Sequence, residues 1–169
     1  EKVAAGKPLI YAANKDNSGK MVELALKYGC PLAVYASDGL SELAELTEKV
    51  SKDGVEDIII DPRARDFARS LTTLTQLRRL ALKKSFHPLG YPIITFPGEA
   101  AASPEEEALL AGQQIAKYAG IIILNHFSPS VAYPLLTLRL NIYTDPQKPI
   151  QMTPGVYQIG APKETSPLC

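Results

Sequence analysis

The chain has 169 residues, of which 46% are hydrophobic and 21% are charged, and its 18 basic and 18 acidic side chains give zero net charge. This length fits one ordinary domain with a sizeable core. The charge balance excludes a global attraction to nucleic acid or to an anionic membrane, although it leaves room for a local basic patch. Apolar runs such as 120–124 fall far short of the roughly 20 residues that span a bilayer. No signal segment opens the chain, so we expect a soluble, cytoplasmic protein.

Short apolar runs alternate with helical patterns along most of the chain. The runs expected to form strands are Pro8–Ala13, Pro31–Ala36, Asp57–Ile60, Tyr91–Phe96 and Gly120–Leu124. Beyond them, Val131–Leu140 is expected to form a shorter helix that is interrupted near Pro134. Asn141–Tyr143 is expected to form a sixth strand.

Each helix expected between these strands has its own sequence signals. Ser41 is expected to cap the second helix, Asp61-Pro62 to begin the third and Ser103-Pro104 to begin the fourth. Helical spacing also predicts the side chains that face the core. They are Met21, Leu24, Ala25 and Tyr28; Leu43, Leu46 and Val50; Phe67, Leu71, Leu74, Leu77 and Ala81; and Ala108, Gly112, Ile115 and Ala119.

Alternation of strands and helices requires parallel pairing and right-handed crossovers. Two architectures satisfy this requirement: an open doubly wound sheet and a (β/α)8 barrel. Five or six strands suit the open sheet as a complete domain, whereas a barrel needs eight strands and usually about 250 residues. Periodicity alone does not choose between the two.

In both architectures, ligands bind at the carboxyl ends of the strands. The candidate binding residues at those ends are Asn14, Asp38, Asp61 and Asn125. Polar side chains in this arrangement could bind a pterin, a phosphate or the edge of a corrin. The alternative is that Asp38 and Asp61 only cap helices.

The sequence contains no recognisable catalytic or metal-binding motif. His87 and His126 are far apart and lie in no zinc-binding or corrinoid-ligating pattern. His126 either acts as an acid or base near neutral pH or is a solvated loop residue. Cys30 and Cys169 are too few for a four-thiolate cluster, and we expect Cys30 to be buried. We therefore expect no catalytic residue and no metal ligand.

A basic stripe is expected on the third helix, opposite its core face. Its residues are Arg63, Arg65, Arg69, Arg78 and Arg79, with Lys83 and Lys84 beyond them. A solvated outer face is the usual role of such a stripe. A docking surface for an acidic partner is the alternative.

Four stretches of the chain resemble one protein family. They are PLIYAANKDN (8–17), CPLAVYASDGLSELAEL (30–46), DPRARDFARSLTTLTQLRRLALKKSFHPLGYPIITF (61–96) and the tail from Leu138, with its TDP-x-x-P and P-G-x-Y-x-x-G turns. In this order and spacing they resemble the large (gamma) subunit of the corrinoid/iron–sulfur protein of the acetyl-CoA decarbonylase/synthase (carbon monoxide dehydrogenase/acetyl-CoA synthase) system. The resemblance covers essentially the whole chain.

The resemblance implies a partial (β/α)8 barrel and a piece of a longer protein. Residues 1–145 would belong to the later part of the barrel domain. Residues 146–169 would connect it to a cobamide-binding domain that is not present in this chain. The intact family protein would hold a cobamide, a B12-type corrinoid, and a [4Fe–4S] cluster. Neither would be bound by ligands from these residues, and Cys169 would not be a cluster ligand.

The function implied by the resemblance is methyl transfer in the Wood–Ljungdahl pathway of acetyl-CoA synthesis. A methyltransferase passes a methyl group from a methyl-pterin to the cobamide, and the carrier delivers it to acetyl-CoA synthase. This chain would be scaffold rather than a self-sufficient enzyme. Its partners would be the small subunit in a heterodimer, the methyltransferase and acetyl-CoA synthase/CO dehydrogenase, with no nucleic acid and no membrane.

Two alternatives stay open at this point. The first is a pterin-dependent methyltransferase on a related barrel, in which Asn14, Asp38, Asp61 and Asn125 hold the pterin. The second is a small doubly wound domain that binds an unrelated ligand.

Overall fold

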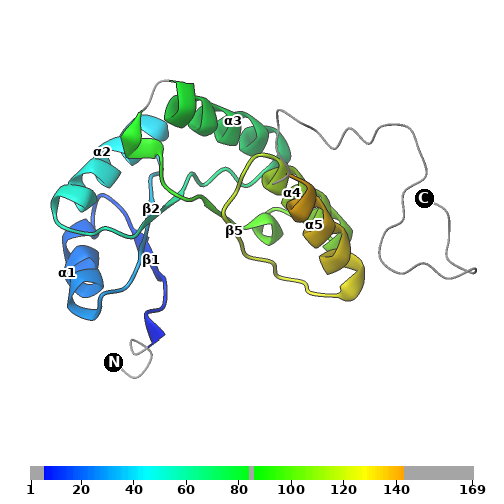
Figure 1. Ribbon diagram of the computed structural model, residues 1–169, viewed down its shortest axis with the longest axis horizontal. Helices are drawn as coiled ribbons and strands as arrows, with labels where there is room; N and C mark the ends of the chain where they lie inside the picture. The colour runs from blue at the N-terminus through cyan, green and yellow to red at the C-terminus, as the bar shows by residue number, and fades with distance from the viewer. Residues whose placement is uncertain (1–5, 84–85, 143–169) are drawn as a thin grey trace, which may run out of the picture.

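The computed structural model describes residues 6–83 and 86–142 (Figure 1). Its strands are β1 (Ile10–Ala13), β2 (Leu32–Tyr35), β3 (Ile58–Asp61), β4 (Ile94–Thr95) and β5 (Ile121–Ile122). Its helices are α1 (Ser18–Tyr28), α2 (Leu40–Lys52), α3 (Phe67–Lys83), α4 (Pro104–Ala116) and α5 (Pro129–Ile142), with short 3-10 turns η2 (His87–Leu89) and η3 (Pro97–Glu99). All five predicted strands are confirmed; four are shorter than predicted, and β3 is shifted by one residue.

The strands are parallel and follow the order of the chain. β1, β2 and β3 form one sheet, and β4 pairs with β5. A parallel bridge between Ile60 and Ile93 joins the two groups. Figure 1 shows the helices along the outside of an arc and the strands on its inner side. A doubly wound sheet reverses its strand order at a switch point, and the described residues contain no such reversal.

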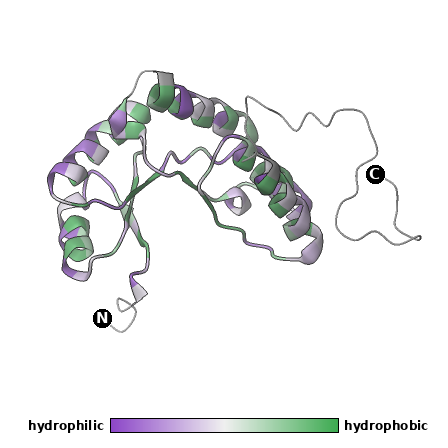
Figure 2. Cartoon of the chain, viewed as in Figure 1, coloured by the Kyte–Doolittle hydropathy of each residue, from purple (hydrophilic) through white to green (hydrophobic). Residues whose placement is uncertain are grey.

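The core lies between the first sheet and the helices outside it. Leu32, Val34 and Ile60 on the strands are fully buried, and Leu74 of α3 covers them from the helix layer. Figure 2 shows the strands as mainly hydrophobic and the helices as mixed. This pattern is what strands covered by amphipathic helices require. Cys30 is buried, as predicted.

Some predicted core faces are wrong. Leu24 of α1 is 41% exposed, and Phe67 of α3 is 45% exposed, whereas Val22 is buried in α1. The apolar residues of α1 are compatible with more than one buried face. In the structure, the buried face of α1 consists of Ser18, Val22 and Ala25.

The helix predicted over Val131–Leu140 is confirmed as part of α5, but its predicted interruption and the predicted sixth strand are wrong. α5 runs through Pro134 without interruption and includes Asn141 and Ile142, so these two residues do not begin a sixth strand. Pro134 lies early in the helix, where the lost backbone bond is near the open first turn. Leu138 of α5 lies against Gly112 of α4, and this packing supports the helix beyond the proline. Tyr143 and the predicted connecting segment 146–169 lie outside the described residues.

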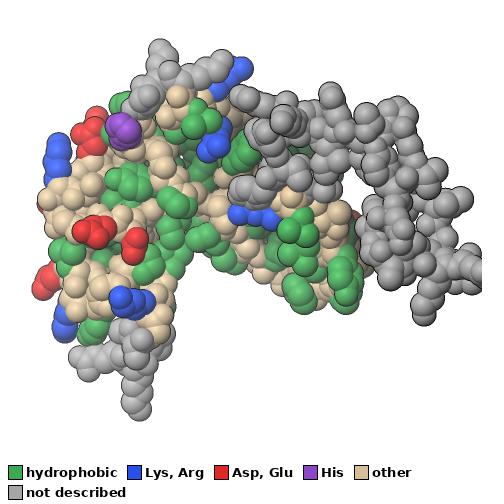
Figure 3. All heavy atoms as spheres, viewed as in Figure 1, with side chains coloured by type: hydrophobic (Ala, Val, Ile, Leu, Met, Phe, Trp, Pro, Cys, Tyr) green, Lys and Arg blue, Asp and Glu red, His purple; other side chains and the backbone are tan. Residues whose placement is uncertain are grey.

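The outer face of α5 is apolar. Tyr133 is 71%, Leu136 is 58% and Leu140 is 73% exposed, and Figure 3 shows a group of hydrophobic side chains over this helix. No helix within residues 6–83 and 86–142 is long and apolar enough to cross a membrane.

Candidate functional site

A polar cluster at the carboxyl end of β3 is centred on the buried side chain of Asp61. Asp61 has no exposed surface. Arg65 donates to both carboxylate oxygens, at 2.8 and 2.7 Å. The Tyr11 hydroxyl donates to it at 2.7 Å, and the backbone N–H of Arg63 at 2.8 Å. Four donors leave this carboxylate well satisfied, which is the condition for burying a charge.

The predicted capping role of Asp61 is wrong. α3 begins at Phe67, and Asp66 caps it by accepting the backbone N–H of Arg69 at 2.8 Å. Asp61 is therefore separated from the helix by a loop. The loop gives its carboxylate to the strand-end cluster instead.

Arg65 joins this cluster to the loop that follows β4. Its Nε also donates to Glu99 of η3, and its guanidinium lies 4.9 Å from the ring centre of Phe96. Burial lowers the pKa of Arg65, but its hydrogen bonds and charge interactions with Asp61 and Glu99 outweigh burial and raise it above the ordinary value. Arg65 is thus held as a permanent cation between two carboxylates.

Aromatic rings cover the cluster on the side of β1 and β2. The ring centre of Tyr11 lies 5.1 Å from that of Phe96 and 6.5 Å from that of Tyr35. Burial, followed by the hydrogen bond to Asp61, raises the pKa of Tyr11 to about 12. The Arg63 guanidinium lies 5.0 Å from the centre of the Tyr35 ring. Arg63 has a φ of 49°, a left-handed conformation that is uncommon outside glycine.

Asn14 reaches the same group of residues from the end of β1. Its Nδ2 donates to the Tyr35 hydroxyl at 2.9 Å. Its Oδ1 accepts the backbone N–H groups of Asp16 and Asn17, both at 3.0 Å, which closes the turn before α1. Because Tyr35 is the register partner of Asp61, strand pairing brings two of the predicted candidates, Asn14 and Asp61, to one end of the sheet.

Asp38 does not join this cluster. It is exposed beside a hollow of about 240 Å³ that Asn14 and Tyr35 also line. Its backbone N–H donates to Glu42 at 3.0 Å. The N-cap of α2 is Gly39, with no side-chain cap bond, so the predicted caps from Asp38 and Ser41 are wrong. Ser103 does cap α4, as predicted, by accepting the N–H of Glu106 at 3.2 Å.

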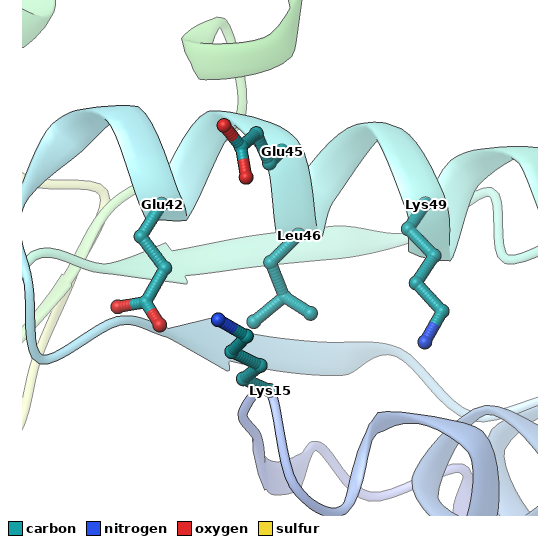
Figure 4. Close-up of a pocket in the computed structure, with 5 residues that line it drawn as sticks. All are labelled: Lys15, Glu42, Glu45, Leu46 and Lys49. Atoms are coloured by element: carbon teal, nitrogen blue, oxygen red, sulfur yellow. The ribbon is translucent and has the colours of Figure 1, made fainter.

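Lys15 lies on the neighbouring hollow, of about 220 Å³, between the β1–α1 loop and α2. Figure 4 shows its side chain pointing toward α2 near Glu42 and Leu46. Lys49, which also lines the hollow, donates to Ser18 at 3.0 Å. This mixture of opposite charges is typical of contacts between a loop and a helix rather than of a ligand site.

A second buried carboxylate, Glu107 of α4, organises the loop after β5. It has no exposed surface and accepts the backbone N–H groups of Asn125 and His126. The His126 Nδ1 lies 2.8 Å from the same carboxylate. Burial opposes the charged form, but the hydrogen bonds from Asn125 and His126 outweigh it and lower the pKa of Glu107. Asn125 therefore contacts Glu107 through its backbone N–H and is not part of the Asp61 cluster.

Gly98 packs directly against this second centre. A Cβ atom at Gly98 would lie 2.6 Å from Oε1 of Glu107 and 2.5 Å from Cγ of Asn125. The turn after β4 thus needs glycine because the loop after β5 approaches its backbone closely.

Neither Tyr11 nor Glu107 was among the site residues predicted from the sequence. A signal for Glu107 was present, since Glu107, Leu110, Ala111 and Gln114 recur at helical spacing on one buried face. An acidic residue at a core position of such a face indicates a buried, hydrogen-bonded carboxylate. For Tyr11 the sequence offered no signal, because its partner lies fifty residues away.

The described side chains do not fit either cofactor that the resemblance implies for the intact protein. In the described ranges, no group of three or more His, Cys, Asp or Glu residues could hold a metal ion. A [4Fe–4S] cluster takes four thiolates, and the whole chain has two cysteines. The hollow of about 240 Å³ at the strand ends is below the range of about 300–1,000 Å³ for drug-sized ligands, and a cobamide is larger than those.

The fold and the strand ends together define a parallel α/β unit whose two buried carboxylates, Asp61 and Glu107, are hydrogen-bonded to protein groups. The family model described as CO dehydrogenase/acetyl-CoA synthase delta subunit matches residues 1–169. The chain belongs to this family.

Two curated relatives agree with that assignment. The chain is 45% identical over 166 residues to the corrinoid/iron-sulfur protein large subunit of Moorella thermoacetica, covering 98% of this chain and 36% of the relative. It is 34% identical over 172 residues to the acetyl-CoA decarbonylase/synthase complex subunit gamma of Methanothermobacter thermautotrophicus, covering 96% and 38%. The predicted resemblance is confirmed. The chain spans little more than a third of the length of these relatives.

One solved structure is similar in fold. The structure of Mycobacterium tuberculosis Rv1207 superposes with a TM-score of 0.54 at 20% identity, covering 85% of this chain and 63% of that one. At this identity the likeness concerns the fold alone and supports a mixed α/β fold.

Proposed function

We propose that this chain is a scaffold part of a methyl-carrier corrinoid/iron–sulfur protein. In this proposal the intact protein accepts a methyl group from a methyl-pterin through a methyltransferase and delivers it to acetyl-CoA synthase. The observation that carries the proposal is the 45% identity over 98% of the chain to a corrinoid/iron-sulfur protein large subunit.

The proposal includes a partial (β/α)8 barrel over residues 1–145, with 146–169 leading to a cobamide domain. The sequential order of five parallel strands supports it, because barrels place strands in chain order with helices outside. Cobamide and the iron–sulfur cluster would be bound elsewhere in the longer protein, which would work in the cytoplasm.

A scaffold role also agrees with the chemistry of the strand ends. The carboxylate oxygens of Asp61 and Glu107 accept hydrogen bonds from protein groups. These carboxylates therefore stabilise loops and are not free to bind a ligand. The exposed apolar face of α5 suits burial within a larger assembly. In the proposal this assembly is the longer subunit and its heterodimer with the small subunit.

The same observations do not favour a pterin-dependent methyltransferase. Asn14 and Asp61 lie together as that alternative requires, but Asn14 closes a turn and Asp61 binds Arg65. Asp38 lines one hollow with Asn14, but Asp61 and Asn125 do not line it, so the four predicted residues do not form one binding surface.

The test is the composition of the intact protein purified with its co-expressed small subunit. We expect a heterodimer with visible absorption from cobalt and from an iron–sulfur cluster. A colourless monomer with no cobalt and no iron, after anaerobic purification with both cofactors supplied, would overturn the proposal.

A further inference from the structure

A groove lies between α3 and the segment that joins α4 to β5. It consists of two adjoining hollows of about 240 and 130 Å³, and Arg78 and Tyr118 line both of them. The Arg78 guanidinium lies 4.5 Å from the centre of the Tyr118 ring. Tyr118 has a φ of 65°, which a tyrosine rarely adopts, so the backbone holds this ring in a strained position beside the arginine. We call this feature the α3–α4 groove.

The α3–α4 groove lies at the opposite end of the strands from the Asp61 cluster. Its lining residues Pro92 and Ile93 precede β4, and Tyr118 precedes β5, so they belong to the amino ends of these strands. Substitutions in the groove can therefore be made without touching the polar clusters described above.

Every charged side chain that lines the groove is basic. These side chains are Arg78, Arg79 and Lys117. The ion pairs found among the described residues involve other side chains. Because the whole chain has zero net charge, three cations around one groove are a local concentration rather than part of a general excess.

The sequence-predicted basic stripe is thus divided by the fold. Arg63 and Arg65 turn to the strand-end cluster, whereas Arg78 and Arg79 line the groove. Lys117, at the end of α4, also lines the groove. It was not part of the basic stripe predicted from the sequence.

Apart from Thr75, the other side chains that line the groove are aliphatic or aromatic. Leu74, Leu77 and Leu89 form buried lining, and Tyr91 and Tyr118 lie at its border. Cations around an apolar floor with tyrosine rings fit a peptide that carries both carboxylates and an apolar anchor. Nucleic acid binding relies instead on many phosphate contacts, and three cations on a neutral chain offer few.

We propose that the α3–α4 groove is a docking site for a short acidic segment of a partner protein. Carboxylates of this segment pair with Arg78, Arg79 and Lys117, and one of its apolar side chains packs against Tyr118. The proposal goes beyond the methyl-carrier function and does not depend on it, since the groove is defined by charge and shape alone.

The test measures binding of a labelled Glu-rich peptide with a central Phe by fluorescence anisotropy, using the full chain. The double variant Arg79→Glu/Lys117→Glu should weaken binding by about tenfold or more, because it places like charges beside the peptide. The matched control is Lys20→Glu/Lys27→Glu on α1, where Lys27 also lies over a tyrosine ring, Tyr28, at 5.1 Å. We expect this control to bind within about twofold of the unmodified chain, since exposed charges far from a site contribute little.

Further probes separate the proposal from other kinds of binding. Arg79→Gln alters one exposed side chain without adding a charge and should weaken binding by about threefold, with an unchanged circular dichroism spectrum. The same peptide with Gln in place of Glu should bind much more weakly. Equal losses in the control, equal binding of the Gln peptide, no peptide binding at all, or tighter binding of a single-stranded oligonucleotide would each overturn the proposal.

Discussion

Arg65 donates two hydrogen bonds, of 2.8 and 2.7 Å, to the carboxylate of Asp61, which is fully buried. The same arginine contacts Glu99 in the loop after β4. Arg65 therefore links the end of β3, in the sheet of β1, β2 and β3, to the loop after β4, in the pair of β4 and β5. Within residues 6–83 and 86–142, the bridge between Ile60 and Ile93 is the only strand pairing between the two groups, and the ion pair adds a side-chain link across the same boundary.

Replacing Asp61 tests this link. Asp61→Asn should lower the free energy of unfolding by about 3 kcal/mol, because it leaves the guanidinium of Arg65 without its buried counter-charge. Asp38→Asn is the control, since this aspartate is exposed, and it should change stability by less than about 0.5 kcal/mol. Urea unfolding measures both values. Similar effects from the two variants would show that the link does not stabilise the fold.

Tyr11 gives a dependence of stability on alkaline pH. Its pKa in the folded chain is about 12 against an ordinary value of 10.0, so between these values the folded state holds a proton that the unfolded state has released. Stability should therefore fall as the pH rises from 10 to 12. Tyr11→Phe should flatten this fall, and Tyr133→Phe, at an exposed position, should leave it as it is. The measurement is the free energy of unfolding of each variant between pH 10 and 12. An equal slope with pH for Tyr11→Phe and the unmodified chain would contradict the prediction.

Glu107 gives a dependence on acidic pH. Because its pKa is lowered in the folded chain, its contribution is present above pH 4.5 and is lost as the pH falls through the folded value. At neutral pH, Glu107→Gln should cost about 2 kcal/mol, since it weakens hydrogen bonds to a charged acceptor. It should also make the acid-induced loss of stability shallower. Glu45→Gln, on the exposed side of α2, should do neither; a matching acid profile for both variants would contradict the assignment.

Gly98 tests the close approach of the loops after β4 and β5. Gly98→Ala should destabilise the chain by about 2 kcal/mol, because the added methyl group would overlap Glu107 and Asn125. Gly19→Ala is the matched control in α1, where a Cβ meets open space. It should leave stability unchanged or raise it by up to about 1 kcal/mol, as alanine favours helices. Thermal unfolding of both variants is the measurement, and a neutral Gly98→Ala would refute the close contact.

The strands and the order of the elements were predictable because apolar runs and helical spacing are local properties of the sequence. β3 lies at 58–61 where 57–60 was predicted, for example. The end of the described region was not predictable in this way. Pro134 suggested an interruption of α5, whereas the helix is continuous and packs against α4 through Leu135 and Leu138.

The strand-end cluster was predictable in part. Parallel pairing correctly brought Asn14 and Asp61 to one end of the sheet. The sequence could not show that Asp61 is held by Tyr11 and Arg65, since that depends on how distant loops fold together. It also could not show that Asn125 acts through its backbone on Glu107. Because of these contacts, we interpret the strand-end residues as groups that hold the loops in place through hydrogen bonds, and not as a ligand-binding site.

In the proposed function, this chain supports a methyl carrier and transfers no methyl group by itself. The most direct measurement mixes the purified chain with a methyl-pterin and reduced cobamide and follows the visible spectrum of the cobalt. We predict no conversion of cobalt(I) to methylcobalt with the chain alone, and conversion when the full-length protein and its methyltransferase are supplied. Conversion at a comparable rate with the chain alone would contradict the account and support a methyltransferase.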